Sequence, residues 1–222
     1  AGSNYDGVSK ATSYKRFETV DLHERNPEVR PNAPVSAFLE DRQGNLWVGH
    51  PKSGLAMYSR HGDGALRIAH DPDDPASLTP QPILSLFEDS RSQIWIGTYR
   101  GGLYRYDPAS GELSAFRHDP QDPHSIGGHD IRAIAESDDG TLWFATHGNG
   151  LIRFERSSGR FSNYTVGNRD ETGFHVHNDW INTLLVDRQQ HIWLGARNGV
   201  ARIAPDRKTY THFLAGVPAQ GS

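Results

Sequence analysis

Short runs of alternating apolar and polar residues recur along this chain, and a period of two residues is that of β-strands. Two clear examples are Leu103 to Tyr106 and Leu151 to Phe154, each of which begins directly after a glycine. Turn residues such as Asp, Ser, Gln and Gly separate these runs, and no stretch of useful length has the periodicity of a helix. The pattern therefore predicts an all-β protein.

The tryptophans show that these runs belong to a repeat. Trp47, Trp95, Trp143 and Trp193 follow one another at intervals of 48, 48 and 50 residues. Each is preceded by Leu or Ile and is followed, two residues later, by Gly or Ala. A large indole at a fixed position in every unit is typical of a packing seam between neighbouring sheets. We therefore interpret these four tryptophans as markers of the fold rather than of a binding site.

Each repeat unit is predicted to contain four strands. In the second unit they are 83–87, 94–98, a strand that begins at Gly102-Leu103, and 112–117. Four strands in roughly 50 residues make the size of one blade of a β-propeller. The sequence therefore predicts four four-stranded blades, at residues 35–78, 83–126, 131–174 and 181–214.

The predicted propeller occupies residues 14–214. Residues 14–20 resemble an outer strand that lacks the rest of its blade, residues 1–13 are predicted to be a disordered or vector-derived leader, and residues 215–222 a tail. A four-bladed ring has no vacancy for an extra strand, so we expect the chain to be part of a larger ring of about seven blades. Its open edges would favour self-association. A closed ring of four or five blades, in which the N-terminal strand pairs with the last blade, is the alternative.

The composition excludes several classes of function. The 222 residues include 23 Lys and Arg against 27 Asp and Glu, and the net charge of -4 gives no reason to expect binding to nucleic acid or to an anionic membrane. The lack of cysteine excludes disulfides and Cys-ligated zinc. No apolar run reaches the about 18 residues of a membrane span, and the N-terminus lacks the features of a signal peptide. We expect a chain that neither crosses a membrane nor carries its own export signal.

Catalytic motifs are missing from the sequence. It contains no nucleophile elbow, Walker loop, dinucleotide fingerprint or His-Glu-x-x-His stretch. Glu40, Glu88 and Glu136 recur at the outer turn of each blade, so they are predicted to be spread round the ring rather than paired as in a glycosidase. We expect a non-enzymatic protein that needs no cofactor.

Two motifs indicate a family. Phe87 to Asp107 contains an apolar strand end, Glu-Asp, a hairpin, Ile-Trp-Ile-Gly-Thr and Gly-Gly-Leu-Tyr-Arg-Tyr-Asp, and His-Asp-Pro-x-Asp-Pro-x-Ser occurs at 70–77 and 118–125. Together they resemble the two-component-regulator propeller repeat. The resemblance implies the periplasmic sensor domain of a membrane receptor whose output is a histidine kinase or a diguanylate cyclase, and in several such proteins it implies recognition of oligosaccharides. The departures from the pattern are Ser137, Ala196 and the loop 167–179.

Loops on one rim of the predicted propeller carry the candidate ligand-binding residues. The loops between second and third strands share this rim with the loops that cross to the next blade, and a rigid scaffold usually presents its functional residues on such loops. The candidates are His50, Lys52, Tyr99, Arg100, His147, Asn149, Trp180, Arg197 and Asn198.

Trp180 is the most informative candidate, because the other units have Pro34, Pro82 or Asp130 at its position. It is therefore not one of the repeated seam indoles. A ring at the mouth of the axial channel could stack on the apolar face of a sugar, while nearby Arg and Asn side chains bind the hydroxyl groups. The alternative interpretation is a half-buried loop anchor.

The histidines offer a metal alternative. His175, His177 and Asp179 alternate along the chain, which would place three ligands on one side of an extended segment. Solvated loop histidines are the simpler interpretation. His70 and His118 recur at one repeat position, which indicates that they hold the crossing loops through hydrogen bonds. The Asp-Pro pairs that follow them could bind calcium, but they are more typical of turns.

Three functions compete at this point. The first is a non-catalytic periplasmic sensor that binds a small polar ligand or an oligosaccharide and signals to the remainder of a parent receptor. The second is a lyase that resembles streptogramin lyases, with His147, His175 and His177 around a divalent ion. The third is a protein-interaction platform that docks on other propeller blades through its open faces.

Overall fold

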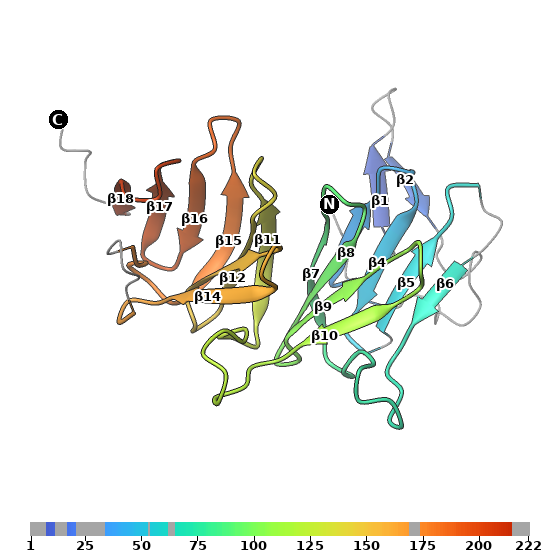
Figure 1. Ribbon diagram of the computed structural model, residues 1–222. Coiled ribbons are helices and arrows are strands. Elements are labelled where there is room, and N and C mark those ends of the chain that lie inside the picture. Colours follow the sequence, from blue (N-terminus) through green and yellow to red (C-terminus); the bar gives the residue numbers. More distant parts are fainter. Residues whose placement is uncertain are drawn as a thin grey trace. The chain divides into compact units, whose positions relative to one another are not determined.

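A computed structural model describes residues 8–11, 17–20, 34–52, 54–61, 65–168 and 174–214 of the chain. Within these ranges every regular element is a β-strand, as the alternation predicts (Figure 1). The strands form one two-stranded sheet and four four-stranded sheets. Among the described residues there is no helix of the length and hydropathy that crossing a membrane requires.

The chain divides into two compact units, residues 1–115 and 116–222. The first unit contains two four-stranded sheets, whose strands are paired in chain order. The strands of the first sheet are β3 (Ala37–Glu40), β4 (Leu46–His50), β5 (Gly54–Tyr58) and β6 (Ala65–Ile68). Those of the second are β7 (Ile83–Glu88), β8 (Ile94–Thr98), β9 (Leu103–Tyr106) and β10 (Leu113–Phe116).

The second unit repeats this arrangement with two further antiparallel sheets. Its first sheet contains β11 (Ile131–Glu136), β12 (Leu142–Thr146), β13 (Leu151–Glu155) and β14 (Arg160–Tyr164). Its second contains β15 (Ile181–Val186), β16 (Ile192–Ala196), β17 (Gly199–Ile203) and β18 (Tyr210–Leu214). All four sheets lie within the predicted blades, which confirms four four-stranded blades. The number of blades in a closed ring stays a prediction.

The N-terminal segment differs from the prediction. Val8–Ala11 forms strand β1 and pairs antiparallel with β2 (Phe17–Val20), with Val8 opposite Val20. The expectation of a disordered leader over 1–13 is therefore wrong for residues 8–11. Strand β2 lies within the predicted stray strand 14–20, but its hydrogen-bonded partner is β1 and not a strand of the last blade. The rest of the leader, residues 12–16 and the tail at 215–222 lie outside the described residues.

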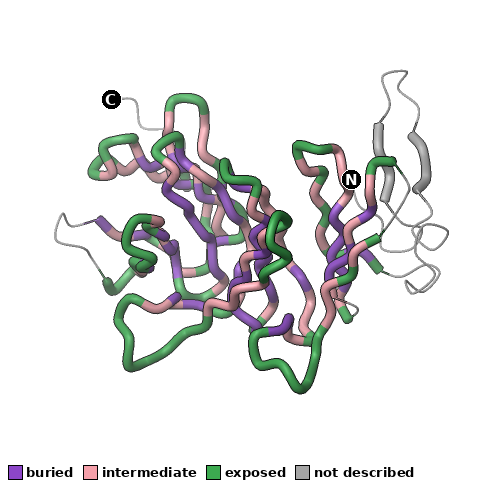
Figure 2. Tube along the Cα trace, turned by 45° about the vertical axis from the view of Figure 1, so that its right-hand side comes forward, coloured by how far each residue is buried: buried purple, intermediate pink, exposed green. Residues whose placement is uncertain are grey.

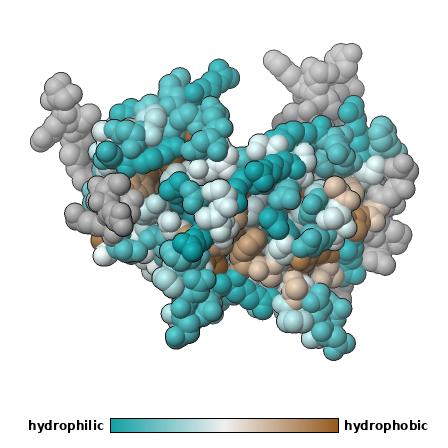
Figure 3. Space-filling view, in the orientation of Figure 1, coloured by the Kyte–Doolittle hydropathy of each residue, from teal (hydrophilic) through white to brown (hydrophobic). Residues whose placement is uncertain are grey.

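In each unit one tryptophan lies in the seam between the two sheets. In the first unit Trp47 is buried against the next sheet in a cluster with Ile83 and Ile94. In the second unit Trp143 packs in the same way with Ile192 and Leu194. Buried residues follow the strands and exposed ones the loops (Figure 2), and hydrophilic residues cover most of the face seen in Figure 3.

A hydrogen bond within each blade fixes the position of the indole. The Nε1 group of Trp95 donates to the carboxylate of Asp89 at 2.7 Å, six residues earlier in the hairpin. The same bond recurs in the other three blades, and in the third blade Ser137 replaces the Asp and accepts from Trp143 at 2.8 Å. The departure of Ser137 from the repeat pattern therefore preserves the contact, because a hydroxyl oxygen can accept the same bond.

The crossing loops are held as the sequence predicts. The Nδ1 atom of His70 lies 2.9 Å from the carbonyl oxygen of Leu78, and Nδ1 of His118 lies 3.1 Å from that of Ile126. The carboxylate of Asp71 accepts a bond from the backbone of Asp73, two residues on, which is the geometry of an Asx turn. These contacts confirm the turn interpretation of the Asp-Pro pairs.

A glycine opens the third strand of each blade for a steric reason. Gly54 and Gly150 have φ values of 80° and 71°, which favour a residue without a side chain. A Cβ atom at these positions would collide with the backbone oxygen of Ile68 or of Tyr164 on the neighbouring strand. In the first and third blades, the loop between the second and third strands therefore ends at a glycine that no other residue can replace without strain.

Candidate functional site

Trp180 and His147 meet on the crossing-loop rim of the second unit. They form an isolated antiparallel β-bridge, and their rings contact edge to face with centroids 4.2 Å apart and an interplanar angle of 78°. Trp180 is 52% exposed, whereas His147 is half-buried. His147 thus contacts the indole while about half of the Trp180 surface stays open to solvent.

Backbone hydrogen bonds fix this pair. The carbonyl oxygen of Asp179 accepts bonds from the N–H groups of Gly148 and Gly150 at 2.8 and 3.0 Å. The carboxylate of Asp179 accepts a third bond, from the N–H of Val166 at 2.8 Å. The loop after β12 is therefore joined to the residue before Trp180, which gives the indole a defined position. A defined position lowers the entropic cost of binding a ligand.

Asn198 is brought beside Trp180 through Asn178. The Asn178 side chain donates from Nδ2 to Oδ1 of Asn198 at 2.7 Å, and its own Oδ1 accepts a bond from the backbone N–H of Trp180, also at 2.7 Å. This leaves the Nδ2 group of Asn198 as a donor. Arg197, the preceding residue, is exposed. Sequence reasoning missed Asn178, because nothing in the repeat pattern marks it.

Asn149 lies in the loop that carries His147. It is exposed, and its backbone N–H donates to the hydroxyl of Thr146 at 3.2 Å. The structure therefore places Trp180, His147, Asn149, Arg197 and Asn198 on the loops of the second unit, and joins Trp180 to His147 by ring contact and to Asn198 through Asn178.

The candidates of the first unit behave differently. The guanidinium of Arg100 lies 5.4 Å from the ring centroid of Tyr99, and Arg100 has a positive φ of 56°. Lys52 is exposed. His50 is only 2% exposed, and its Nδ1 atom lies 2.9 Å from the carbonyl oxygen of Pro34. Burial lowers the pKa of His50 below its usual value. The prediction that His50 faces a ligand is therefore wrong, because its ring is part of the packed blade.

The predicted metal set does not come together. His175 and His177 stack with centroids 5.0 Å apart, and His177 stacks in turn on Tyr210 at 4.2 Å. The carboxylate of Asp179 is engaged by Val166. Within the described ranges no group of three or more His, Asp or Glu side chains is placed to hold a metal ion. This arrangement lends no support to the alternative of a metal site at His175, His177 and Asp179.

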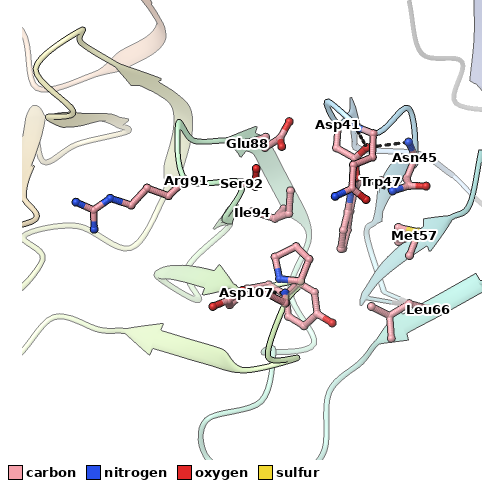
Figure 4. A pocket seen from close by; sticks show the side chains of 14 residues that line it. Asp41, Asn45, Trp47, Met57, Leu66, Glu88, Arg91, Ser92, Ile94 and Asp107 are labelled. Atoms are coloured by element: carbon pink, nitrogen blue, oxygen red, sulfur yellow. Dashed lines mark hydrogen bonds between the residues drawn. The ribbon is translucent and has the colours of Figure 1, made fainter.

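The opposite rim contains a pocket that sequence reasoning missed. It lies in the first unit, between the sheets β3–β6 and β7–β10, and has a volume of about 300 Å³ (Figure 4). Asp41, Trp47, Glu88, Tyr106 and Asp107 are among its lining residues. No motif in the sequence marks this pocket, because its lining residues belong to the strands and turns of the repeat frame.

Comparisons with known proteins agree with the family resemblance. The sequence pattern of the two component regulator propeller matches residues 30–52, 77–100 and 125–148. The matched segments end in the loops that follow β4, β8 and β12, so each includes the first two strands of a blade. Three segments of the chain thus match the two component regulator propeller repeat. Among curated proteins, no significant match is found.

Solved structures share the fold. The extracellular domain assigned to a hybrid two component system of B. thetaiotaomicron matches with a TM-score of 0.69 and 22% identity, over 81% of this chain and 24% of that one. PorZ, a surface component of the type-IX secretion system of Porphyromonas gingivalis, matches with a TM-score of 0.70 and 16% identity, over 96% of this chain and 32% of that one. A streptogramin B lyase matches with a TM-score of 0.67 and 16% identity, over 96% and 63%.

These likenesses establish the architecture and leave activity open, since one fold hosts many functions. The chain spans between about a quarter and somewhat under two thirds of the length of these structures. The matched segments and the shared fold make this chain similar to propeller domains, among them the extracellular domain of a two component system.

Proposed function

We propose that this chain is a non-catalytic, extracytoplasmic ligand-binding module of a bacterial signal-transduction receptor, located in the periplasm. The propeller repeats and the fold shared with the extracellular domain of a two-component system support the class. The observation that carries the proposed site is Trp180, a half-exposed indole in ring contact with His147. Such a module would transmit binding to a histidine kinase or cyclase in the same receptor.

The proposed ligand is a glycan or a similar polar molecule. The open face of Trp180 suits the apolar C–H face of a pyranose ring, and Asn198 supplies an amide donor for a hydroxyl group. Arg197 and Asn149 add further polar groups on the same loops. The site is a shallow surface with one large ring and several hydrogen-bonding groups, which is suited to reversible binding. The side chains that form it, Trp180, His147, Asn149, Arg197 and Asn198, include no carboxylate, whereas a glycosidase needs a pair.

A glycan array, followed by calorimetry on each ligand found, tests the proposal. Trp180→Ala should abolish the signal, while Trp180→Phe should retain part of it, because a smaller ring still stacks. Phe38→Ala is the control, since Phe38 is also an exposed aromatic residue, at 41%, but lies on β3 of the first unit. Binding that is equally strong in wild type and Trp180→Ala would overturn the site.

A second function has support from one specific surface. The sheet β15–β18 carries Leu185, Val200 and Phe213, which are 59%, 41% and 42% exposed, and Phe213 stacks on Trp193. The corresponding face of the preceding sheet, around Trp143, packs on β15–β18 itself. We propose that this face docks on another propeller blade. Light scattering over a range of concentrations tests this proposal, because Leu185→Lys should lower the molar mass of any oligomer.

A further inference from the structure

The pocket of the first unit combines an apolar floor with an acidic rim. Trp47 and Tyr106 form a ring pair in the floor, with centroids 5.7 Å apart, and Met57, Leu66 and Ile94 line the remainder. Asp41, Glu88 and Asp107 bring three carboxylates to the same pocket. Figure 4 shows Asp41 and Glu88 together at one end of it. A volume of about 300 Å³ is that of a small ligand or of one long side chain.

Two arginines offset part of this negative charge. The backbone N–H of Arg42 donates to Oε2 of Glu88 at 2.8 Å, and its guanidinium lies 3.8 Å from Oε1. That guanidinium donates more closely to the carbonyl oxygen of Asp89, at 2.7 Å. Arg91 also lines the pocket, but its side chain points away from Asp41 and Trp47 (Figure 4). Arg91, the arginine among the lining residues drawn, therefore does not lie between Asp41 and Trp47.

The equivalent seam of the second unit contains a guanidinium from the chain itself. Arg207, in the turn between β17 and β18, lies with its guanidinium 5.3 Å from the ring centroid of Trp143. Its Nη1 group donates to the carbonyl oxygen of Gln190 at 2.9 Å, and its Nη2 group donates to the hydroxyl of Ser137 at 3.2 Å. The pocket that remains there has a volume of about 190 Å³.

The repeat relates the two seams residue by residue. Ser137, which accepts from Arg207, corresponds to Asp41, because each lies six residues before its tryptophan and accepts its indole N–H. Gln190 corresponds to Ser92, and both have a positive φ, of 65° and 60°. Both atoms that hold the guanidinium in the second unit thus have counterparts in the lining of the first pocket, one of them now a carboxylate.

The remaining differences between the seams also concern charge. Glu88 pairs with Ile94 in the register where Val186 pairs with Ile192, so the first pocket has a carboxylate where the second has an apolar side chain. Asp107 likewise takes the place of Ala204 at the start of the last turn. That turn in the first unit, 107–112, contains no arginine or lysine. The first seam is therefore more acidic and has no cation of its own in this turn.

We propose that the pocket between β3–β6 and β7–β10 binds an alkylguanidinium group. The aliphatic stem would lie against Met57 and Leu66, and the guanidinium beside the buried Trp47–Tyr106 pair, close to the carbonyl oxygen of Ser92. The carboxylate of Asp41, which already accepts bonds from Gln43, Asn45 and Trp47, would contribute negative charge at this end of the pocket. A carboxylate attracts a guanidinium more strongly than a hydroxyl does, because the interaction is charge-assisted. This site lies in another unit than Trp180 and does not depend on the proposed function.

Two small molecules with planar head groups of similar shape test the charge requirement: n-butylguanidinium, which is a cation, and n-butylurea, which is neutral. In NMR or calorimetric titrations n-butylguanidinium should bind at least about tenfold more tightly than n-butylurea, a difference of about 1.4 kcal/mol. Binding should weaken as salt is added. Equal binding of the urea, or no saturable binding of n-butylguanidinium, would overturn the proposal.

Two variants taken from the second unit locate the site. Asp41→Ser introduces the residue found at Ser137 and retains an acceptor for the Trp47 indole, and Glu88→Val introduces the counterpart Val186. Each should weaken n-butylguanidinium binding by about tenfold. Asp187→Ser makes the same turn substitution in the last blade and is the control, which should bind as wild type does. Unchanged binding in both pocket variants, with folding verified by near-UV circular dichroism, contradicts the assignment.

A third compound tests whether the guanidinium group comes from a protein partner or from a free small molecule. N-acetyl-arginine amide, which represents an arginine within a polypeptide, should bind at least as tightly as n-butylguanidinium if a protein partner supplies the side chain. Weaker binding assigns the site to a free guanidinium compound, and the guanidinium site is supported in either case. Glycan binding at Trp180 should be the same in Asp41→Ser and in wild type, so failure of either proposal leaves the other intact.

Discussion

The two units use one frame to make two different seams. In the second unit Arg207 covers the Trp143 ring, and Ser137 and Gln190 hold its guanidinium. In the first unit Tyr106 contacts the buried Trp47 ring, and the pocket beside this pair is lined by carboxylates. The frame residues are therefore common to both seams, whereas the variable turn residues decide whether a seam is filled by the chain or is left as a pocket.

The rims differ in the same way. Pro82 precedes β7 in the first unit, and its carbonyl oxygen accepts a bond from the N–H of Tyr99 at 2.9 Å. At the corresponding position of the second unit Trp180 precedes β15, and its ring contacts His147. The second unit keeps the equivalent backbone bond, from the N–H of His147 to the carbonyl oxygen of Asp130 at 3.1 Å, and adds an exposed aromatic side chain before β15. The proposed glycan site therefore lies where the chain departs from the repeat.

The largest expected loss of stability comes from removing a tryptophan between two packed sheets, compared with one on an exposed sheet face. Trp143 is 3% exposed and lies between two sheets, whereas Trp193 is partly exposed on a sheet face that carries exposed Leu185 and Phe213. Trp143→Ala should lower the free energy of unfolding by about 3–5 kcal/mol, because it leaves a cavity between packed sheets. Trp193→Ala should cost about 1–2 kcal/mol. Urea denaturation measures both, and equal losses would show that the two faces are equally covered in solution.

The next largest loss of stability should follow removal of the hydrogen bond between the turn carboxylate and the indole. Asp89 is fully buried and accepts from Trp95 Nε1 as well as from the backbone N–H groups of Arg91 and Gln93. Asp89→Ala should cost about 2–3 kcal/mol, because a buried donor loses its acceptor. Asp89→Ser should cost less, since Ser137 makes this bond in the third blade. The order of the two midpoints in urea is the measurement, and Ser at or below Ala would contradict the argument.

Substitution of Arg207 should lower stability by a smaller amount, and it tests whether this guanidinium fills the seam of the second unit. Arg207→Met keeps the apolar stem but removes the cation–π contact and the bonds to Gln190 and Ser137, so it should cost about 1–2 kcal/mol. Lys208→Met, at the exposed neighbouring position, should change the free energy of unfolding by no more than about 0.5 kcal/mol. Equal effects of the two substitutions would indicate that the guanidinium is not held in the seam. The Arg207→Met variant should also acquire a wider pocket over Trp143.

Much of the fold follows from sequence because it depends on local periodicity. In the second blade, the spacing of the tryptophans and the period of two between turns place the ends of β7 and β10 within one residue of those observed, and the ends of β8 at 94–98 as observed. Asp-Pro turns and recurring His70 and His118 are equally local, since their partners lie within eight residues. The strand β1 was missed because Val8–Ala11 has no counterpart in the repeat.

The candidate sites follow less well because they depend on contacts between blades. Trp180 was identified because it breaks the repeat, yet its link to Asn198 passes through Asn178, which no pattern marks. His50 occupies a loop position in the repeat but points into its own blade. The pocket over Trp47 arises from residues on four separate turns and strands, and its charge is visible only when Asp41 is compared with Ser137 in three dimensions.

The smallest expected effect is a pH dependence that distinguishes a buried from an exposed histidine. Burial holds the pKa of His50 below its usual 6.5, and the positive charge of Arg67 lowers it further, although the contact with the Pro34 carbonyl oxygen opposes them. The unfolded chain therefore binds a proton at His50 more readily than the folded one, so this contribution to stability is present above pH 6.5 and is lost as the pH falls below it. Replacing the ring by Gln should flatten the fall of the thermal midpoint between pH 7 and about pH 5. His61→Gln, at an exposed turn position, should leave the profile as it is. If the His50→Gln profile is as steep as that of wild type, the ring is hydrated in solution. His50 would then again be a candidate ligand-binding residue on the rim.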